Sequence, residues 1–169
     1  NSLLIKDMIK ISPYGVLYYR VYGGKINGAM PFTNLENHPG NDLHYYNPFA
    51  FNLMNRFEYL SDKYAGVSME HNIGSGLFRF IPIHQMLKWR QFYTAKTLWG
   101  SLSDENIAIN NKAGTFKTLN GKTYIEVGTG IDNIFKVFRL DFVWRLSPSA
   151  SYTAPSSDFG IFGSFQIQF

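Results

Sequence analysis

The sequence contains no cysteine, so disulfide bonds, thiolate metal sites and cysteine nucleophiles are all excluded. An N-terminal lipidated cysteine is excluded for the same reason. Charged residues make up only 17% of the 169 positions, and the 16 Lys and Arg residues are scattered without forming a run. Despite a net charge of +4 and a pI near 9.2, the sequence therefore gives little support for nucleic-acid binding.

Long hydrophobic runs are also missing. No stretch approaches the ~18 consecutive apolar residues of a transmembrane helix, although this does not exclude membrane β-strands. The chain opens on Asn1-Ser2-Leu3, with no initiator Met and no signal-peptide pattern, so we expect a mature or internal portion of a longer product. With 45% apolar residues, the chain can build a substantial core.

Aromatic residues are abundant, with 15 Phe, 11 Tyr and 3 Trp, and many of them recur with a period of two. In residues 135–146, Phe138, Leu140, Phe142 and Trp144 alternate with charged or smaller side chains. This alternation predicts a two-faced β-strand. Residues 159–169 alternate in the same way and end on Phe169.

Residues 87–99 predict a further strand, and this one is bounded by Trp89 and Trp99. At a rise of ~3.3 Å per residue and a tilt of ~40°, ten positions project to roughly 25 Å. That is the height of the apolar band between the aromatic girdles of an outer-membrane barrel. Weaker alternation predicts strands over residues 3–11, 16–26, 51–60, 64–73 and 123–131.

The cost of burying charge in lipid decides which face of these strands points inward. An Arg or Lys facing lipid at mid-depth costs ~2 to 4 kcal/mol, so the charged face is expected to line the interior of a barrel. The predicted lumen charges are Arg56, Glu58, Glu70, Lys88, Arg90, Glu126, Arg139, Asp141 and Arg145, together with Arg20 and Lys96. The predicted lipid face and girdle comprise Trp89, Trp99, Phe138, Leu140, Phe142 and Trp144.

The segments between the predicted strands differ in length. Residues 61–63 and 131–134 are predicted as tight turns, whereas 27–49, 100–122 and 147–158 are long and rich in Asn, Ser, Gly and Pro. Membrane barrels place short turns on the periplasmic side and long loops outside. Counting strands back from a periplasmic C-terminus puts the 61–63 turn on the wrong side. We therefore expect one strand between Tyr64 and Ile131 to be missed or wrongly assigned, with residues 76–86 the suspected place.

Several long stretches resemble one family. KISPYGVLYYRVYGGKINGAMPF, FNLMNRFEYLSDKYAG, EHNIGSGLFRFIP and GKTYIEVGTGIDNIFKVFRLDFVWR resemble the C-terminal barrel of a Bacteroidota outer-membrane family of undefined function. Its members typically carry an N-terminal carboxypeptidase-regulatory-like β-sandwich. The last strands are loosely similar to barrels of the surface-antigen and outer-membrane assembly-factor superfamily. The terminal strand, with Phe165, Ile167 and Phe169, resembles the recognition signal for barrel insertion.

Catalytic and metal sites receive weak support. His38 and His44 flank Asp42 in a polar loop and form a conceivable metal site, but no metal-ligand spacing supports it over solvated or loop-packing roles. Glu58, Glu70, Glu126 and Asp141 are candidate acid/base groups, yet no nucleophile or phosphate-cradling loop accompanies them. A salt-bridged network that satisfies buried charge is the alternative. We therefore predict no catalytic residue, metal or cofactor.

The prediction is an all-β, antiparallel transmembrane barrel, of which residues 1–169 form the C-terminal part with about seven or eight strands. The expected function is a non-catalytic scaffold, assembly or transport component of a cell-envelope complex in the bacterial outer membrane. Its expected partners are outer-membrane lipids, the barrel-insertion machinery and other outer-membrane or periplasmic proteins. The alternatives are the last strands of a TonB-dependent uptake receptor, a small complete eight-stranded barrel, and a soluble all-β carbohydrate-binding or hydrolytic domain.

Overall fold

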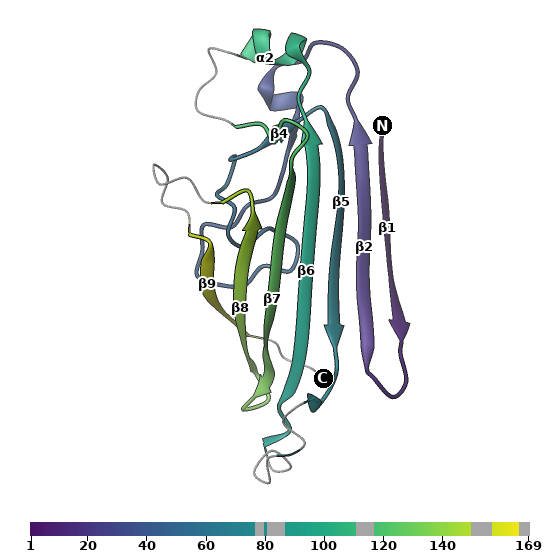
Figure 1. Ribbon diagram of the computed structural model, residues 1–169, viewed down its shortest axis with the longest axis vertical. Helices are drawn as coiled ribbons and strands as arrows, with labels where there is room; N and C mark the ends of the chain where they lie inside the picture. Colours follow the sequence, from purple (N-terminus) through teal and green to yellow (C-terminus); the bar gives the residue numbers. More distant parts are fainter. Residues whose placement is uncertain (77–79, 81–86, 111–116, 150–156, 166–169) are drawn as a thin grey trace.

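The computed structural model describes residues 1–76, 80, 87–110, 117–149 and 157–165. These form a seven-stranded antiparallel sheet in the order β1-β2-β5-β6-β7-β8-β9 (Figure 1). Strands of this sheet that follow one another along the chain are therefore neighbours in it. The strands are β1 (Ser2–Lys10), β2 (Val16–Lys25), β5 (Lys63–Asn72), β6 (Arg90–Ser101), β7 (Thr123–Ile134), β8 (Phe138–Ser147) and β9 (Phe159–Phe165).

Short elements lie in the connections. The segment between β2 and β5 holds the 3-10 helix η1 (Phe32–Asn34) and a two-stranded sheet of β3 (Glu36–Asn37) and β4 (Leu60–Ser61). Helix α2 (Asp104–Asn110) lies between β6 and β7. The amides of Asn106 and Asn110 bind α2 to the main chain at Gly28 and Met30. These bonds join the two long connections at one end of the sheet.

The antiparallel all-β prediction is confirmed, and seven predicted strands are present. The prediction of a strand over residues 51–60 is wrong. Phe51, Asn52, Leu53 and Met54 are all buried in succession, whereas a two-faced strand buries every second residue. Phe51, Leu53 and Met54 are apolar and pack in a turn-rich segment against the sheet, so their composition resembles that of a strand.

Removing that strand resolves the inconsistency in the strand count, so the error lies before residue 64 and the expectation that it lies between Tyr64 and Ile131 is wrong. Residues 61–63 are no longer a hairpin turn but the end of one long connection, residues 26–62. The connections 11–15, 73–89 and 135–137 then lie at one end of the sheet, and 26–62, 102–122 and 148–158 lie at the other. The suspected segment 76–86 lies largely outside the described residues. The predicted 131–134 turn is also wrong, because β7 continues to Ile134.

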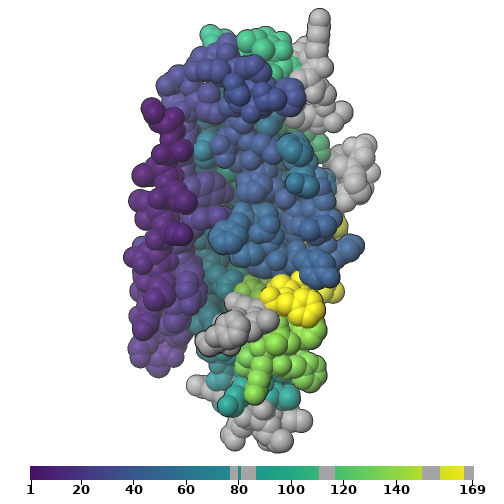
Figure 2. All heavy atoms as spheres, turned by 180° about the vertical axis from the view of Figure 1, so that it is seen from behind, coloured from purple at the N-terminus to yellow at the C-terminus, as the bar shows by residue number. Residues whose placement is uncertain are grey.

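The core lies between the sheet and the long connection of residues 26–62. Figure 2 shows this connection spread over one face of the sheet, which we call the inner face. Phe51, Met54 and Tyr59 of the connection pack with Leu98 of β6 and Tyr124 of β7. A second cluster joins Tyr46 and Leu53 to Val143 of β8 and Phe162 of β9. The opposite face, which we call the outer face, has no such cover among the described residues.

The sheet is open in the described part of the chain, because β1 and β9 each have one neighbouring strand in it. The outer edge of β9 is partly occupied at Gly163. The Gly163 carbonyl accepts the Tyr46 N–H at 3.0 Å, and the Gly163 N–H reaches the His44 carbonyl at 3.3 Å. The edge strand β1 is exposed along its whole length.

Candidate functional site

Charged side chains gather on the inner face, because every second residue of each strand points there. Glu126, Asp132, Arg139, Asp141 and Arg145 are each at most 7% exposed. On the outer face of β8 and β9, Phe138, Trp144, Leu146 and Phe165 are between 38% and 64% exposed. The inner face thus buries charged side chains together with the apolar core, and the outer face exposes aromatic ones, whereas a water-soluble sheet usually turns its charge to solvent.

The first charge cluster is centred on Arg139 of β8. Its guanidinium donates to both carboxylate oxygens of Glu70, at 2.8 and 2.9 Å, and to both oxygens of Asp141, at 2.8 to 3.2 Å. It also lies 3.7 Å from the centre of the Phe92 ring. Both carboxylates are thus ion-pair partners of one guanidinium, in the bidentate geometry typical of strong Arg–carboxylate pairs. This arrangement supports the salt-bridged reading of Glu70 and Asp141 over an acid/base role.

The second cluster is centred on Glu126 of β7, and it binds main chain. Its two carboxylate oxygens accept the backbone N–H groups of Asn52 and Leu53, at 2.9 and 2.8 Å. The Tyr124 hydroxyl donates to the same carboxylate at 2.8 Å. Three donors to one buried carboxylate satisfy a charge that would otherwise be costly to bury.

Cations of the sheet bind the carbonyl groups of the same segment. The Lys96 ammonium donates to the carbonyls of Ala50 and Asn47, at 2.6 and 3.1 Å. Arg145 donates to the Leu53 carbonyl at 3.3 Å and to the Tyr59 hydroxyl at 3.0 Å. The inner face therefore holds residues 47–53 by both the donors and the acceptors of their backbone.

Glu58 belongs to this network although it lies on the connection and not on a strand. Its carboxylate accepts the Asn55 N–H at 3.0 Å and lies 3.5 Å from Arg145 and 3.3 Å from Lys117. Glu58 is thus buried among the inner-face charges, but the strand on which its prediction as a lumen residue was based does not exist.

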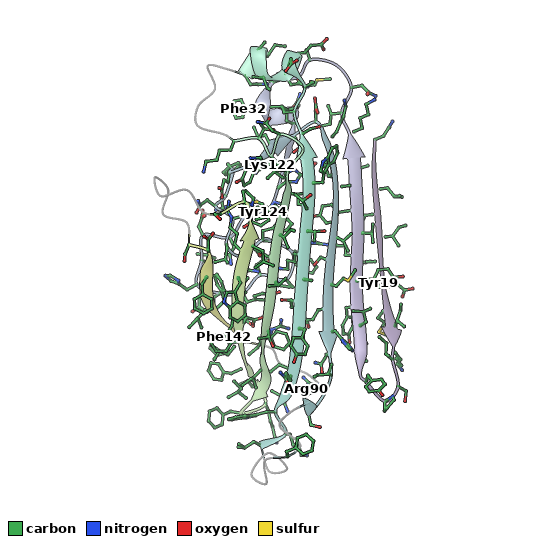
Figure 3. The ribbon with its side chains drawn as sticks, in the orientation of Figure 1. Tyr19, Phe32, Arg90, Lys122, Tyr124 and Phe142 are labelled. Atoms are coloured by element: carbon green, nitrogen blue, oxygen red, sulfur yellow. The ribbon has the colours of Figure 1, made fainter. Side chains whose placement is uncertain are left out.

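Arg90 and Asp132 form a third cluster near the short-turn end of the sheet, where Figure 3 labels Arg90. The Arg90 Nε lies 2.7 Å from Asp132, whose carboxylate also accepts from the Asn72 amide at 3.2 Å. Asp132 was missed as an interior residue because it was assigned to a turn. The alternation Glu126, Gly128, Gly130, Asp132 carries the signal that would have found it.

Two predicted lumen charges lie elsewhere. Arg56 is exposed, in the turn-rich segment that replaces the predicted strand. Lys88 is exposed, precedes β6 and has a φ of +52°, so it has no place in the strand alternation. Both assignments extended a period of two beyond a real strand, and both are wrong.

The predicted lipid-face residues divide in the same way. Phe138, Leu140, Phe142 and Trp144 lie on the outer face of β8, and Trp99 lies on the outer face of β6 (Figure 3 labels Phe142). Cross-strand ring pairs cover part of this face: Phe138 with Phe165 at 4.5 Å, and Trp144 with Phe159 at 5.2 Å between centroids. Trp89 precedes β6, so the two Trp residues do not bracket one strand as predicted. Ile167 and Phe169 lie outside the described residues.

His38 is buried in the long connection and is not arranged as a metal ligand. Its Nε2 lies 2.9 Å from the Ser61 hydroxyl, and its ring stands edge-on to Tyr64 at 5.4 Å. Burial lowers the pKa of His38 to about 4. His44 is exposed, and His84 lies outside the described residues. Within the described ranges, no group of three or more His, Cys, Asp or Glu residues is placed to hold a metal ion.

Asp62 ties the end of the connection to the next one. Burial acts to raise the pKa of its carboxyl group, but hydrogen bonds from Ser103 and Asn106 outweigh this and lower it. The Ser103 N–H donates at 2.9 Å and the Asn106 amide at 3.0 Å. The carboxylate is thus a structural acceptor at the long-loop end of the sheet.

Comparison with known proteins gives no match to a family model, a curated protein or a solved structure. Among the helices of the described residues, none has the length and apolar character needed to cross a membrane. The site must therefore be interpreted from its own geometry.

Proposed function

We propose that this chain forms the C-terminal wall of a bacterial outer-membrane β-barrel, acting as a non-catalytic scaffold, assembly or transport component of a cell-envelope complex. The observation that carries the proposal is that the sheet buries charged side chains on its inner face and exposes aromatic ones on its outer face. Among the described residues of the outer face, leaving out the strand ends, Asp7 is the one charged side chain. On the inner face, each of the strands β2, β5, β6, β7 and β8 carries at least one charged side chain. Lipid around the outer face accounts for this difference.

Strand length and loop length support the same proposal. A tilted membrane strand needs roughly 9 to 11 residues. The first six strands of the sheet contain between 9 and 12 residues. The turns 11–15 and 135–137 at one end of the sheet are as short as the periplasmic turns of barrels, although the connection 73–89 at the same end is longer, and the connections 26–62, 102–122 and 148–158 lie at the other end.

The interior charges favour a structural role over a catalytic one. Glu70, Asp141, Glu126 and Glu58 are each engaged by guanidinium, ammonium or backbone N–H groups. The connection of residues 26–62 fills much of the concave side and is held there by these groups. In this proposal it is an internal plug of the barrel wall, which we call the inner plug.

The family resemblance supplies the finer part of the proposal. It suggests a Bacteroidota outer-membrane protein with a carboxypeptidase-regulatory-like sandwich upstream, and with outer-membrane lipids, the insertion machinery and other envelope proteins as partners. A TonB-dependent receptor would share the same wall, so the upstream sequence discriminates between the two. The soluble-domain alternative must explain exposed Phe138, Trp144 and Phe165 on one continuous face.

Fractionation of cells that produce the full-length protein tests the proposal. We expect the protein in the outer-membrane fraction, resistant to urea extraction, and with a gel mobility that changes on heating. Recovery of a monomeric protein in detergent-free buffer, without heat-modifiable mobility, would contradict it.

A further inference from the structure

A cavity of about 800 Å³ lies on the inner face, between β1, β2 and β5 on one side and Tyr46, Pro48 and Phe49 of the inner plug on the other. Figure 2 shows the hollow between the purple β1–β2 hairpin and the blue plug segment. Ligand sites in proteins commonly span 300 to 1,000 Å³, so the volume suits a small organic molecule.

A row of cations crosses this cavity. In the strand register, Lys6 of β1 is paired with Arg20 of β2, Arg20 with Ser68 of β5, and Ser68 with Lys96 of β6. Paired residues of antiparallel strands project to the same face with Cβ atoms about 5 Å apart. All four residues line the cavity. Three cations and one hydroxyl therefore stand side by side along one edge-to-centre row of the sheet.

These cations differ from the other inner-face cations in their partners. Arg90, Arg139 and Arg145 each form an ion pair with a carboxylate. Among the ion pairs of the described residues, none involves Lys6, Arg20 or Lys96. The two carboxylates of the inner face that border the cavity, Glu70 and Asp132, are already held by Arg139 and Arg90. Asp7 of β1 also lines the cavity, so the lining holds four cations (Lys6, Arg20, Arg90 and Lys96) and three carboxylates (Asp7, Glu70 and Asp132), a small excess of positive charge.

Aromatic groups orient these cations and add an apolar wall. The Arg20 guanidinium lies 5.3 Å from the Tyr22 ring centre and 5.7 Å from that of Phe49, and it reaches the Phe49 carbonyl at 3.4 Å. The side chains of Phe49 and Tyr18 are 69% and 48% exposed and border the same hollow. An apolar body placed against them would remove this surface from water.

We propose that this cavity binds an oxyanion carried on an apolar or aromatic body, with Arg20, Lys6 and the Ser68 hydroxyl facing the oxyanion and Phe49 and Tyr18 facing the body. Guanidinium and ammonium groups give the strongest hydrogen bonds to phosphate and carboxylate oxygens. Lys96 contributes charge while its ammonium stays on the plug carbonyls. The inference rests on the contacts of the cavity and not on the proposed membrane location.

The test uses 4-fluorophenyl phosphate as the probe and ¹⁹F NMR line broadening as the measurement, on the full chain in micelles or in buffer, whichever keeps it monomeric. We expect saturable broadening that neutral 4-fluorophenol and cationic 4-fluorobenzylammonium do not reproduce. The double variant Lys6→Gln with Arg20→Gln is expected to weaken binding at least about tenfold, because two charge-assisted contacts are removed. Lys10→Gln, which makes the same substitution as Lys6→Gln on the same strand but outside the cavity lining, is the control and should bind as the wild type does.

Competition identifies the source of the oxyanion. Displacement of the probe by inorganic phosphate indicates a soluble phosphate ligand, and displacement by micellar phosphatidic acid but not phosphatidylcholine indicates a lipid headgroup; either result supports the site. Equal binding of 4-fluorophenol overturns the proposal with the wild-type chain alone, so it does not depend on the variants folding. Unchanged binding in a folded double variant, or an equal loss in Lys10→Gln, also overturns it.

Discussion

Four charged residues of the inner face bind main-chain atoms of the inner plug, namely Arg20, Lys96, Glu126 and Arg145. The positions of Glu126, Arg139, Asp141 and Arg145 in the alternation of their strands predict that they point inward, because successive side chains of a strand point to opposite faces. Their partners cannot be predicted in this way. The bonds from Glu126 to the Asn52 and Leu53 N–H groups join positions more than 70 residues apart, and nothing in the local pattern encodes that separation.

Glu126→Gln tests the hold of the sheet on the plug. The substitution removes the charge and replaces one carboxylate oxygen, which accepts a backbone N–H, with an amide group that donates, so we expect the free energy of unfolding to fall by ~1.5 to 3 kcal/mol. Cleavage of residues 43–57 by added protease should also become faster. Glu105→Gln, at an exposed position of α2, is the matched control and should change neither measurement. A stable, protease-resistant Glu126→Gln protein would mean that these bonds do not hold the plug.

His38 predicts a dependence of stability on pH. Its pKa is about 4 when folded and 6.5 in the unfolded chain, so the unfolded state binds more protons between these values. Its contribution to stability is therefore fully present above pH 6.5 and is lost as the pH falls toward 4, by about 3 kcal/mol. Urea unfolding at several pH values measures this.

The variant His38→Gln should flatten that pH dependence, whereas His44→Gln, at an exposed position in the same connection, should leave it unchanged. If His38→Gln keeps the wild-type slope between pH 6.5 and 4, the assignment to His38 is wrong.

At the scale of elements, the sequence predicts strands correctly where apolar and polar residues alternate along the chain. The prediction fails where consecutive residues are all buried. The predicted range 16–26 is close to β2 (Val16–Lys25), and 64–73 is close to β5 (Lys63–Asn72). Residues 51–60 imitate a strand because Phe51 and Met54 belong to the plug side of the core. Asp132 was assigned to a turn because Asn133, a typical turn residue, follows it, but β7 accommodates Asn133 at a φ of +61°.

The depth of an outer-face position should determine how well it tolerates charge. If lipid covers β8, Phe142→Arg places a cation near mid-strand and should lower folding stability by ~2 to 4 kcal/mol, whereas Leu146→Arg near the strand end should cost ~0 to 1 kcal/mol. The folded fraction after assembly into phospholipid vesicles, scored by heat-modifiable mobility, measures the difference. Equal tolerance at both positions would be the behaviour of a face exposed to water.

At the scale of the whole molecule, the sheet separates an apolar outer face from an inner face filled by charge and by the plug (Figures 1 and 2). The alternation of apolar and charged residues predicts this polarity without any knowledge of the partners of the charges, because placing a charge in lipid has a large energetic cost. It did not predict that the long connection would fold back into the concavity. That arrangement depends on hydrogen bonds between distant backbone groups and inner-face side chains.

The most direct test of the account places a probe on adjacent residues of one strand. Because the chain has no cysteine, Val67→Cys and Ser68→Cys each give a single labelling site, on the outer and inner face of β5 respectively. With a fluorophore attached and the protein folded into vesicles of brominated phospholipid, we predict strong quenching at position 67 and little at position 68. Equal quenching at the two positions, or quenching at 68 alone, would contradict the claim that lipid covers the outer face.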